Sequence, residues 1–279
     1  TGCRIAAPLH CSEHIFYCNL GKESARCGGT VVPVTTDDWL KLLWQTADGI
    51  RDALDGFDRW GDGGDRPDQY ALDQVTDARA LEVLTGAGVR ILSEESGLTD
   101  GDTTEVVIVD PVDGSTNASR RIPHYCTSLC VVDDVGPLVG LVVNLASGEA
   151  FAATRGGGAT LDGRPIQATS CDRLSTAIVA LAGWPSKPLG AAQFRSFGAA
   201  ALDLSSVACG RVDGYIDPIG HHGVWDYAAG LLICEEAGAT VVELRGRPLI
   251  HLDHKRRLGP VAGATAKLCE DLRGRQSTS

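Results

Sequence analysis

The sequence predicts a mixed α/β (α+β) fold built from layers of strands and helices. Apolar runs of strand length, such as residues 106–109 and 138–143, alternate with segments whose apolar residues recur at helical spacing. The chain has 279 residues, of which 43% are hydrophobic, so it can bury a sizeable core. Such a length fits one large domain or two lobes that share an interface.

The first predicted helix follows Thr35 and Thr36, whose hydroxyls suit an N-cap, and it carries Asp37 and Asp38 in its first turn. Its apolar positions at helical spacing are Leu40, Leu43, Trp44, Ala47, Ile50 and Leu54. A Gly-rich loop over 61–67 and a short helix over 78–84 come next. Strands are then expected at 89–92 and 106–109.

Strands at 129–132, 138–143 and 150–153 follow, joined by turns that contain Gly. The rest of the chain alternates between a strand at 177–182, a helix at 199–208, a strand at 215–216, a helix at 225–237 and a strand at 240–244. Mixed strands and helices predict α/β layering.

Residues 1–34 show no sustained hydrophobic period and no signal-peptide pattern, so we interpret them as an extension to a domain spanning 35–279. We expect this extension to pack poorly and to be dispensable. The ten cysteines include no C-x-x-C pair, which predicts free thiols in a reducing, cytoplasmic compartment rather than a zinc site.

The charge balance limits the partners. Thirty-six acidic against 25 basic residues give a net charge of −11, which argues against nucleic acid or an anionic membrane as the main partner. No apolar run approaches the roughly 18 residues of a membrane span. A small molecule is the expected partner.

The most informative segment is DPVDGSTN, residues 110–117. A buried strand delivers Asp110 to its carboxyl end, where α/β folds place chemistry, and Gly114 permits a tight turn. Ser115 and Thr116 are expected to cap a following helix. Two carboxylates suit Mg²⁺ and a helix N-terminus suits phosphate, so the segment predicts a metal-assisted phosphate site.

Two further segments carry acids. SEES at 93–96 follows a predicted strand, and WDYAAG at 225–230 begins an apolar helix with Asp226 near its start. Each has a simpler explanation, a solvated loop for the first and an N-cap for the second. Adjacent buried acids without a cation would be unfavourable, which favours the metal site.

Together, in their order and spacing, the three segments resemble the inositol monophosphatase family of magnesium-dependent, lithium-sensitive phosphomonoesterases. The resemblance runs from about residue 36 to 272. It implies a layered α/β/α/β/α sandwich of the inositol monophosphatase and fructose-1,6-bisphosphatase type, and a homodimer.

The resemblance also implies a ligand set for two or three Mg²⁺ ions. Glu94 and Asp110, with the carbonyl of Val112, would hold the first, and Asp110, Asp113 and Asp226 the second. A further acid near the metals matches Asp77.

On the substrate side, the resemblance assigns the backbone N–H groups of Gly114 and Ser115 to the phosphate. Ala200 and Asp217 would lie beside the leaving group. Glu94 and the Ser115 hydroxyl would orient a metal-activated water, so no phosphoenzyme is required. Many relatives have Thr where Ser115 stands, and Ser keeps the hydroxyl. The adjacent residues 221 and 222, both His, are interpreted as surface residues.

Other functions stay open at this point. A haloacid-dehalogenase-type phosphatase needs acids two apart, whereas Asp110 and Asp113 are three apart and Val112 stands where the second acid would be needed. A catalytically silent relative that acts as a binding or scaffolding protein is a second alternative. Among substrates, we expect myo-inositol monophosphate, with histidinol phosphate, fructose 1,6-bisphosphate and nucleotide 3′-phosphates as alternatives.

Overall fold

The larger of two main sheets forms the first half of the protein. The computed structural model describes residues 26–27, 30–31, 33, 35–66 and 69–276. The sheet consists of β3 (Arg90–Ser93), β4 (Gly97–Thr99), β5 (Val106–Asp113), β6 (Cys126–Val132), β7 (Pro137–Asn144), β8 (Ala150–Thr154), β9 (Gly158–Leu161) and β10 (Arg164–Pro165). Its strand order is β10-β9-β8-β7-β6-β5-β3-β4, with β3 and β5 parallel and the other neighbours antiparallel.

The second sheet has five strands in the order β12-β11-β13-β15-β14. They are β11 (Ile178–Leu181), β12 (Gln193–Arg195), β13 (Gly214–Ile216), β14 (Thr240–Glu243) and β15 (Pro260–Gly263), and a short 3-10 helix, η1 (Leu174–Thr176), precedes β11.

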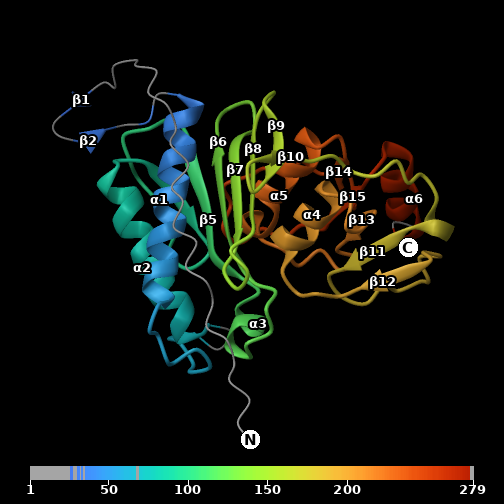
Figure 1. The fold of residues 1–279 in the computed structure, drawn as a ribbon, viewed down its shortest axis with the longest axis horizontal. Coiled ribbons are helices and arrows are strands. Elements are labelled where there is room, and N and C mark those ends of the chain that lie inside the picture. Colours follow the sequence, from blue (N-terminus) through green and yellow to red (C-terminus); the bar gives the residue numbers. More distant parts are fainter. Residues whose placement is uncertain (1–25, 28–29, 32, 34, 67–68, 277–279) are drawn as a thin grey trace, which may run out of the picture.

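Helices lie between the two sheets and on their outer faces (Figure 1). They are α1 (Thr36–Leu54), α2 (Ala71–Gly86), α3 (Ser115–Ser119), α4 (Ala200–Ala208), α5 (Val224–Glu236) and α6 (Ala266–Gln276). Helices α1 and α2 cover the outer face of the larger sheet, α4 and α5 lie between the sheets, and α6 covers the far face of the smaller sheet. This arrangement confirms the predicted α/β/α/β/α layering.

Successive side chains of a strand point to opposite faces of the larger sheet, so each strand contributes to two separate parts of the hydrophobic core. On β5, Val107 and Val109 pack with α1, whereas Val106 and Ile108 pack with α4 and α5. Both faces of a central strand are therefore apolar, which is why these strands appear in the sequence as continuous hydrophobic runs.

Helix α1 is confirmed with its predicted cap, because the Thr35 side chain accepts a hydrogen bond from the Asp38 N–H at 3.1 Å. The helix expected over 78–84 is longer and begins at Ala71. The predictions omitted five short strands, β4, β9, β10, β12 and β15, and helix α6. Four of the five strands have at most four residues with little or no burial, so their side chains give no hydrophobic period.

Most of the predicted extension, residues 1–34, lies outside the described residues. Within it, β1 (Arg26–Cys27) and β2 (Thr30–Val31) pair antiparallel, a hairpin that the sequence did not predict. In the described part of the chain six cysteines are free thiols, in line with the prediction. No described helix is long and apolar enough to cross a membrane.

Candidate metal centre

The register of β3 and β5 brings the first two acids together. Ser93 pairs with Val109 in a parallel ladder, and the Glu94 N–H donates to the Val109 carbonyl at 3.0 Å. Glu94 therefore leaves its strand beside Asp110. This is the edge where the carboxyl ends of the two parallel strands meet.

A β-bulge then sets the direction of Asp113. In a regular strand, residues three apart face opposite sides of the sheet. Asp110 pairs with Ser128 and Asp113 pairs with Cys126, so the two residues between these pairs on β5 oppose one residue on β6. The extra residue turns both carboxylates to one face, and Pro111 and the buried Val112 form the bulge.

Glu94, Asp110 and Asp226 form the acid cluster at the centre of the site. Each offers one carboxylate oxygen, and these oxygens lie within 4.8 Å of one another. Asp226 is the third residue of α5, and it accepts the Gly223 N–H at 2.7 Å. Asp226 is therefore not the N-cap, which is Gly223, but it bonds the N-cap from the third helical position, and the same side chain lies in the cluster.

The Asp110 carboxylate is the most unusual group in the described residues. It is 1% exposed, and neither of its buried oxygens has a hydrogen-bond partner. Burial raises the pKa of Asp110 well above its usual range, and the charges of Glu94, Asp113 and Asp226 raise it further. Burial likewise raises the pKa of Asp226, with Glu94 and Asp113 adding to the rise.

These residues fit a divalent cation. Unpaired carboxylate oxygens grouped in a buried site are hard ligands of the kind that Mg²⁺ and Ca²⁺ bind, and a bound cation would supply the charge partner that Asp110 lacks. Burial also raises the pKa of Glu94 to about 7, helped by the neighbouring charge of Glu95.

Asp113 connects the cluster to the second half of the molecule. Its Oδ2 accepts the Ala201 N–H at 2.7 Å and faces the Cys126 thiol at 3.7 Å. Burial raises the pKa of Asp113 to about 7, against the lowering effect of the Ala201 hydrogen bond. Ala200, at the start of α4, lines a cavity of about 190 Å³ together with Asp113.

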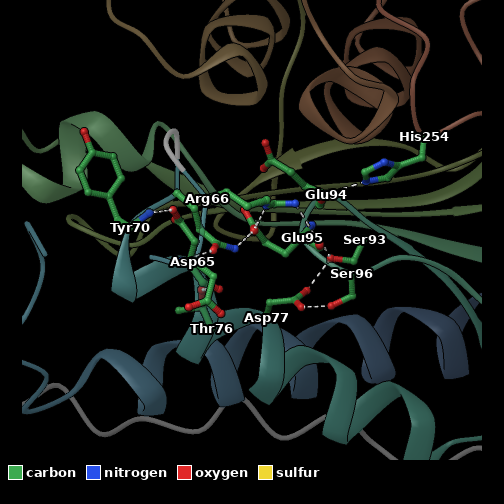
Figure 2. A network of polar contacts seen from close by, with 12 residues as sticks. Asp65, Arg66, Tyr70, Thr76, Asp77, Ser93, Glu94, Glu95, Ser96 and His254 are labelled. Carbon is green, nitrogen blue, oxygen red and sulfur yellow. Dashed lines mark hydrogen bonds and ion pairs between the residues drawn. The ribbon is translucent and has the colours of Figure 1, made fainter. Parts of the chain in front are cut away.

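The two glutamates of SEES have different surroundings (Figure 2). Glu94 points toward the acid cluster, and His254 Nε2 lies 2.8 Å from its backbone carbonyl. The Glu95 carboxylate instead pairs with Arg66 and accepts a hydrogen bond from Gln69. Only the first glutamate therefore lies in the cluster.

Asp77 does not join the cluster of three acids. Its two oxygens accept hydrogen bonds from the hydroxyls of Ser93 and Ser96, and Figure 2 shows it beneath the turn that carries the glutamates. A carboxylate bonded in this way holds the turn in place. That Asp77 lies near bound metals stays a prediction.

Asp73 is a buried acid near the site that was not among the predicted residues. This residue is 4% exposed, burial raises its pKa to about 7, and the charges of Glu95 and Glu94 contribute to the rise. As the third residue of α2, it also accepts the Tyr70 N–H at 2.8 Å. An acid at the third helical position marks a helix start, and that signal was available in the sequence.

Gly114 and Asn117 determine the backbone path of residues 114–117, the part of DPVDGSTN that is expected to bind phosphate. Gly114 has φ 84°, and a Cβ there would lie 3.0 Å from the Gly198 carbonyl oxygen, so only glycine fits. The predicted caps are wrong, because Gly114 occupies the N-cap and Ser115 is the first residue of a five-residue helix. Asn117 Nδ2 donates to the carbonyls of His124 at 2.8 Å and Phe197 at 2.7 Å.

Asp217 is placed differently from the prediction. Its side chain is fully buried, and both oxygens are occupied by backbone N–H groups and by the imidazoles of His221 and His222. It therefore has no oxygen directed at a substrate. The two histidines of the loop before α5 contact the acid.

The comparisons with known proteins agree with this geometry. A model of the inositol monophosphatase family matches residues 69–277. The chain belongs to the inositol monophosphatase family. It is 36% identical over 212 residues, 72% of this chain and 81% of the other, to a protein of Archaeoglobus fulgidus named fructose-1,6-bisphosphatase/inositol-1-monophosphatase.

Two further proteins are similar to this member of the inositol monophosphatase family. It is 38% identical over 172 residues to the Nus factor SuhB of Escherichia coli K12, which covers 56% of this chain but only 63% of that protein. A Pyrococcus horikoshii protein with similarities to inositol-1 monophosphatase shares the fold, with a TM-score of 0.79 at 22% identity over 88% of this chain and all of that one.

Proposed function

We propose that the protein hydrolyses a small phosphate monoester with Mg²⁺, two or three ions per site, and that its substrate is a myo-inositol monophosphate. The single observation that carries this proposal is the Asp110 carboxylate, buried with both oxygens unpartnered beside Glu94 and Asp226. Such a group needs a cation. Membership of the inositol monophosphatase family supports phosphate ester hydrolysis as the reaction in which this cation takes part.

When bound, Mg²⁺ would neutralise the acids and act as a Lewis acid toward the phosphate. Glu94, Asp110, Asp113, Asp226 and the carbonyl of Val112 are proposed to hold it. The backbone N–H groups of Gly114 and Ser115 would bind phosphate oxygens, since N–H groups in the first turn of a helix have no helical acceptor.

The remaining roles belong to side chains at the edge of the cluster. The Ser115 hydroxyl and the Glu94 carboxylate would orient the attacking water in line with the leaving oxygen. Ala200 is proposed to lie beside the leaving group, on the cavity that it shares with Asp113. The proposed reaction forms no phosphoenzyme.

The test is phosphate release from myo-inositol 1-phosphate, histidinol phosphate, fructose 1,6-bisphosphate and a nucleotide 3′-phosphate, with Mg²⁺ or with EDTA. We expect release only with Mg²⁺, the highest kcat/KM for the inositol phosphate, and loss of release in Asp113→Asn. Asp58→Asn is the matched control, because Asp58 is exposed. Full activity of Asp113→Asn, or a trapped phospho-aspartate, would contradict the proposal.

A second candidate is a binding or scaffolding role without catalysis, because bacterial relatives named Nus factor SuhB carry no enzyme name. Well-folded protein that releases no phosphate from any of the four esters would support that role. We also propose a homodimer without nucleic-acid or membrane partners in the reducing cytoplasm. Sedimentation velocity would test the dimer, and the free thiols support the compartment.

A further inference from the structure

A second carboxylate-centred cluster lies in the loop between β13 and α5. The Asp217 carboxylate accepts backbone N–H groups from Ile219, Gly220 and His221, each at 2.9 Å. His221 Nδ1 and His222 Nδ1 lie 3.1 and 2.7 Å from its oxygens. These five partners hold the pKa of Asp217 below its usual range despite its burial, so the carboxylate is ionised at neutral pH.

The carboxylate determines that Nδ1 of each ring carries a proton. Because Nδ1 of each imidazole faces Asp217, each Nδ1 carries the proton and donates it. The Nε2 atoms are on the opposite edges of the rings, which lie 4.3 Å apart. Neither Nε2 has a hydrogen bond to any residue that the structure describes, so both are free for a ligand.

Both histidines line the cavity that Asp113 and Ala200 share. This cavity of about 190 Å³ also contacts Asp113, Ser196, Ala200 and Asp203, and none of its described lining residues is Lys or Arg. Asp113 accepts the Ala201 N–H, and Asp203 Oδ1 lies 2.9 Å from His124 Nε2. The two free imidazole edges are therefore neutral polar groups that this wall offers beside the carboxylates of Asp113 and Asp203.

We infer that His221 and His222 select the leaving group, by binding adjacent hydroxyls of a neutral polyol through their Nε2 atoms. The inference rests on the proposed phosphatase function. A hydroxyl both donates and accepts, so it can bond an imidazole edge in either protonation state. A second phosphate would only accept, and it would face the carboxylates of Asp113 and Asp203 on a described wall that has no Lys or Arg.

The selection therefore acts against bisphosphates as well as for polyols. Asp217 is a positioning residue in this arrangement, because it reaches the substrate only through the two rings. In this inference the imidazoles, rather than the Asp217 carboxylate, contact the hydroxyls of the leaving group. This explains why a carboxylate expected to contact hydroxyls is completely buried.

The experiment compares kcat/KM for myo-inositol 1-phosphate, p-nitrophenyl phosphate and fructose 1,6-bisphosphate with Mg²⁺. His222→Asn keeps an amide donor near the position of Nδ1, toward Asp217, but removes Nε2, and His221→Asn does the same at the more exposed ring. We expect either variant to lower the ratio of the inositol value to the aryl value by at least about tenfold. His222→Gln, which places an amide near Nε2, should restore part of that ratio, and exposed Asp58→Asn should leave it unchanged.

Each other outcome has a defined meaning. An equal loss on the inositol and aryl esters in both Asn variants would show a purely structural role and overturn the inference. Fructose 1,6-bisphosphate hydrolysed by the wild type as efficiently as the inositol ester would also overturn it. Absence of release from all three esters would instead overturn the proposed function itself, and this inference with it.

Discussion

Replacing Glu94 by Gln should stabilise the metal-free protein while abolishing its activity. The Glu94 carboxylate lies with Asp110 and Asp226, and burial and the charge of Glu95 raise its pKa to about 7. Gln has nearly the same shape but no charge. The substitution therefore removes a buried negative charge, together with its repulsion by the neighbouring acids, which a bound cation would otherwise compensate.

The size of this effect follows from the pKa. A carboxyl group whose pKa rises from 4.5 when unfolded to about 7 when folded lowers stability by about 3 kcal/mol once both states are ionised. Below pH 4.5 both states hold the proton, so there is no cost. Between pH 4.5 and 7 the unfolded state ionises first, so the stability of the wild type falls as pH rises.

Urea unfolding in EDTA at pH 4, 6 and 8 measures this difference. We expect Glu94→Gln and wild type to be equally stable at pH 4, and the variant to gain up to about 3 kcal/mol at pH 8. Saturating Mg²⁺ should remove or reverse the gain, because it binds and stabilises the folded wild type. A pH-independent difference, or a variant less stable in EDTA at pH 8, would refute the reasoning, and Asp58→Asn is the control.

Three further predictions concern the frame around the site. Asn117→Ala should lower the free energy of unfolding by about 1–3 kcal/mol in urea and reduce kcat, since Nδ2 joins two loops through their carbonyls; unchanged values would exclude that link. Gly230→Ala should cost about 1–3 kcal/mol by thermal unfolding, because its Cβ would lie 2.7 Å from Leu204 Cβ; a stabilised variant would contradict this packing. Arg155→Met should lower the free energy of unfolding by up to about 1 kcal/mol at pH 7, because it removes the ion pair with Asp133. Arg155 lowers the pKa of Asp133 to about 2, so the difference between variant and wild type should vanish as pH falls from 3.8 through 2. A difference that persists below pH 2 would contradict the pairing.

The sequence predicted the parts of the site that depend on local pattern. Asp110 and Glu94 follow apolar strands, and Asp226 begins an apolar helix, so chain position alone located them. Asp73 was missed because its helix was predicted to start at residue 78, which left the acid in a loop. The first turn of α2 carries its own signal in Asp73, but its apolar residues give no clear helical stripe.

The errors share a different cause, which is dependence on tertiary contacts. Asp217 and His222 are polar loop residues in the sequence, and only the packed structure shows that one is buried by the other. The direction of Asp113 depends on a bulge whose register against β6 cannot be read from residues 110–113 alone.

The backbone contacts of the acids explain why a metal centre can persist in this fold despite its electrostatic cost. Glu94 is fixed by its N–H bond to Val109, Asp226 by the Gly223 N–H, and Asp113 by an N–H group of α4. Each of these positions is held by main-chain hydrogen bonds, which form whether or not a cation is present. Both oxygens of the Asp110 carboxylate lack a hydrogen-bond partner among the described residues. The fold thus preorganises the site around one unsatisfied group, so a cation that binds there gains the interaction without reordering the chain.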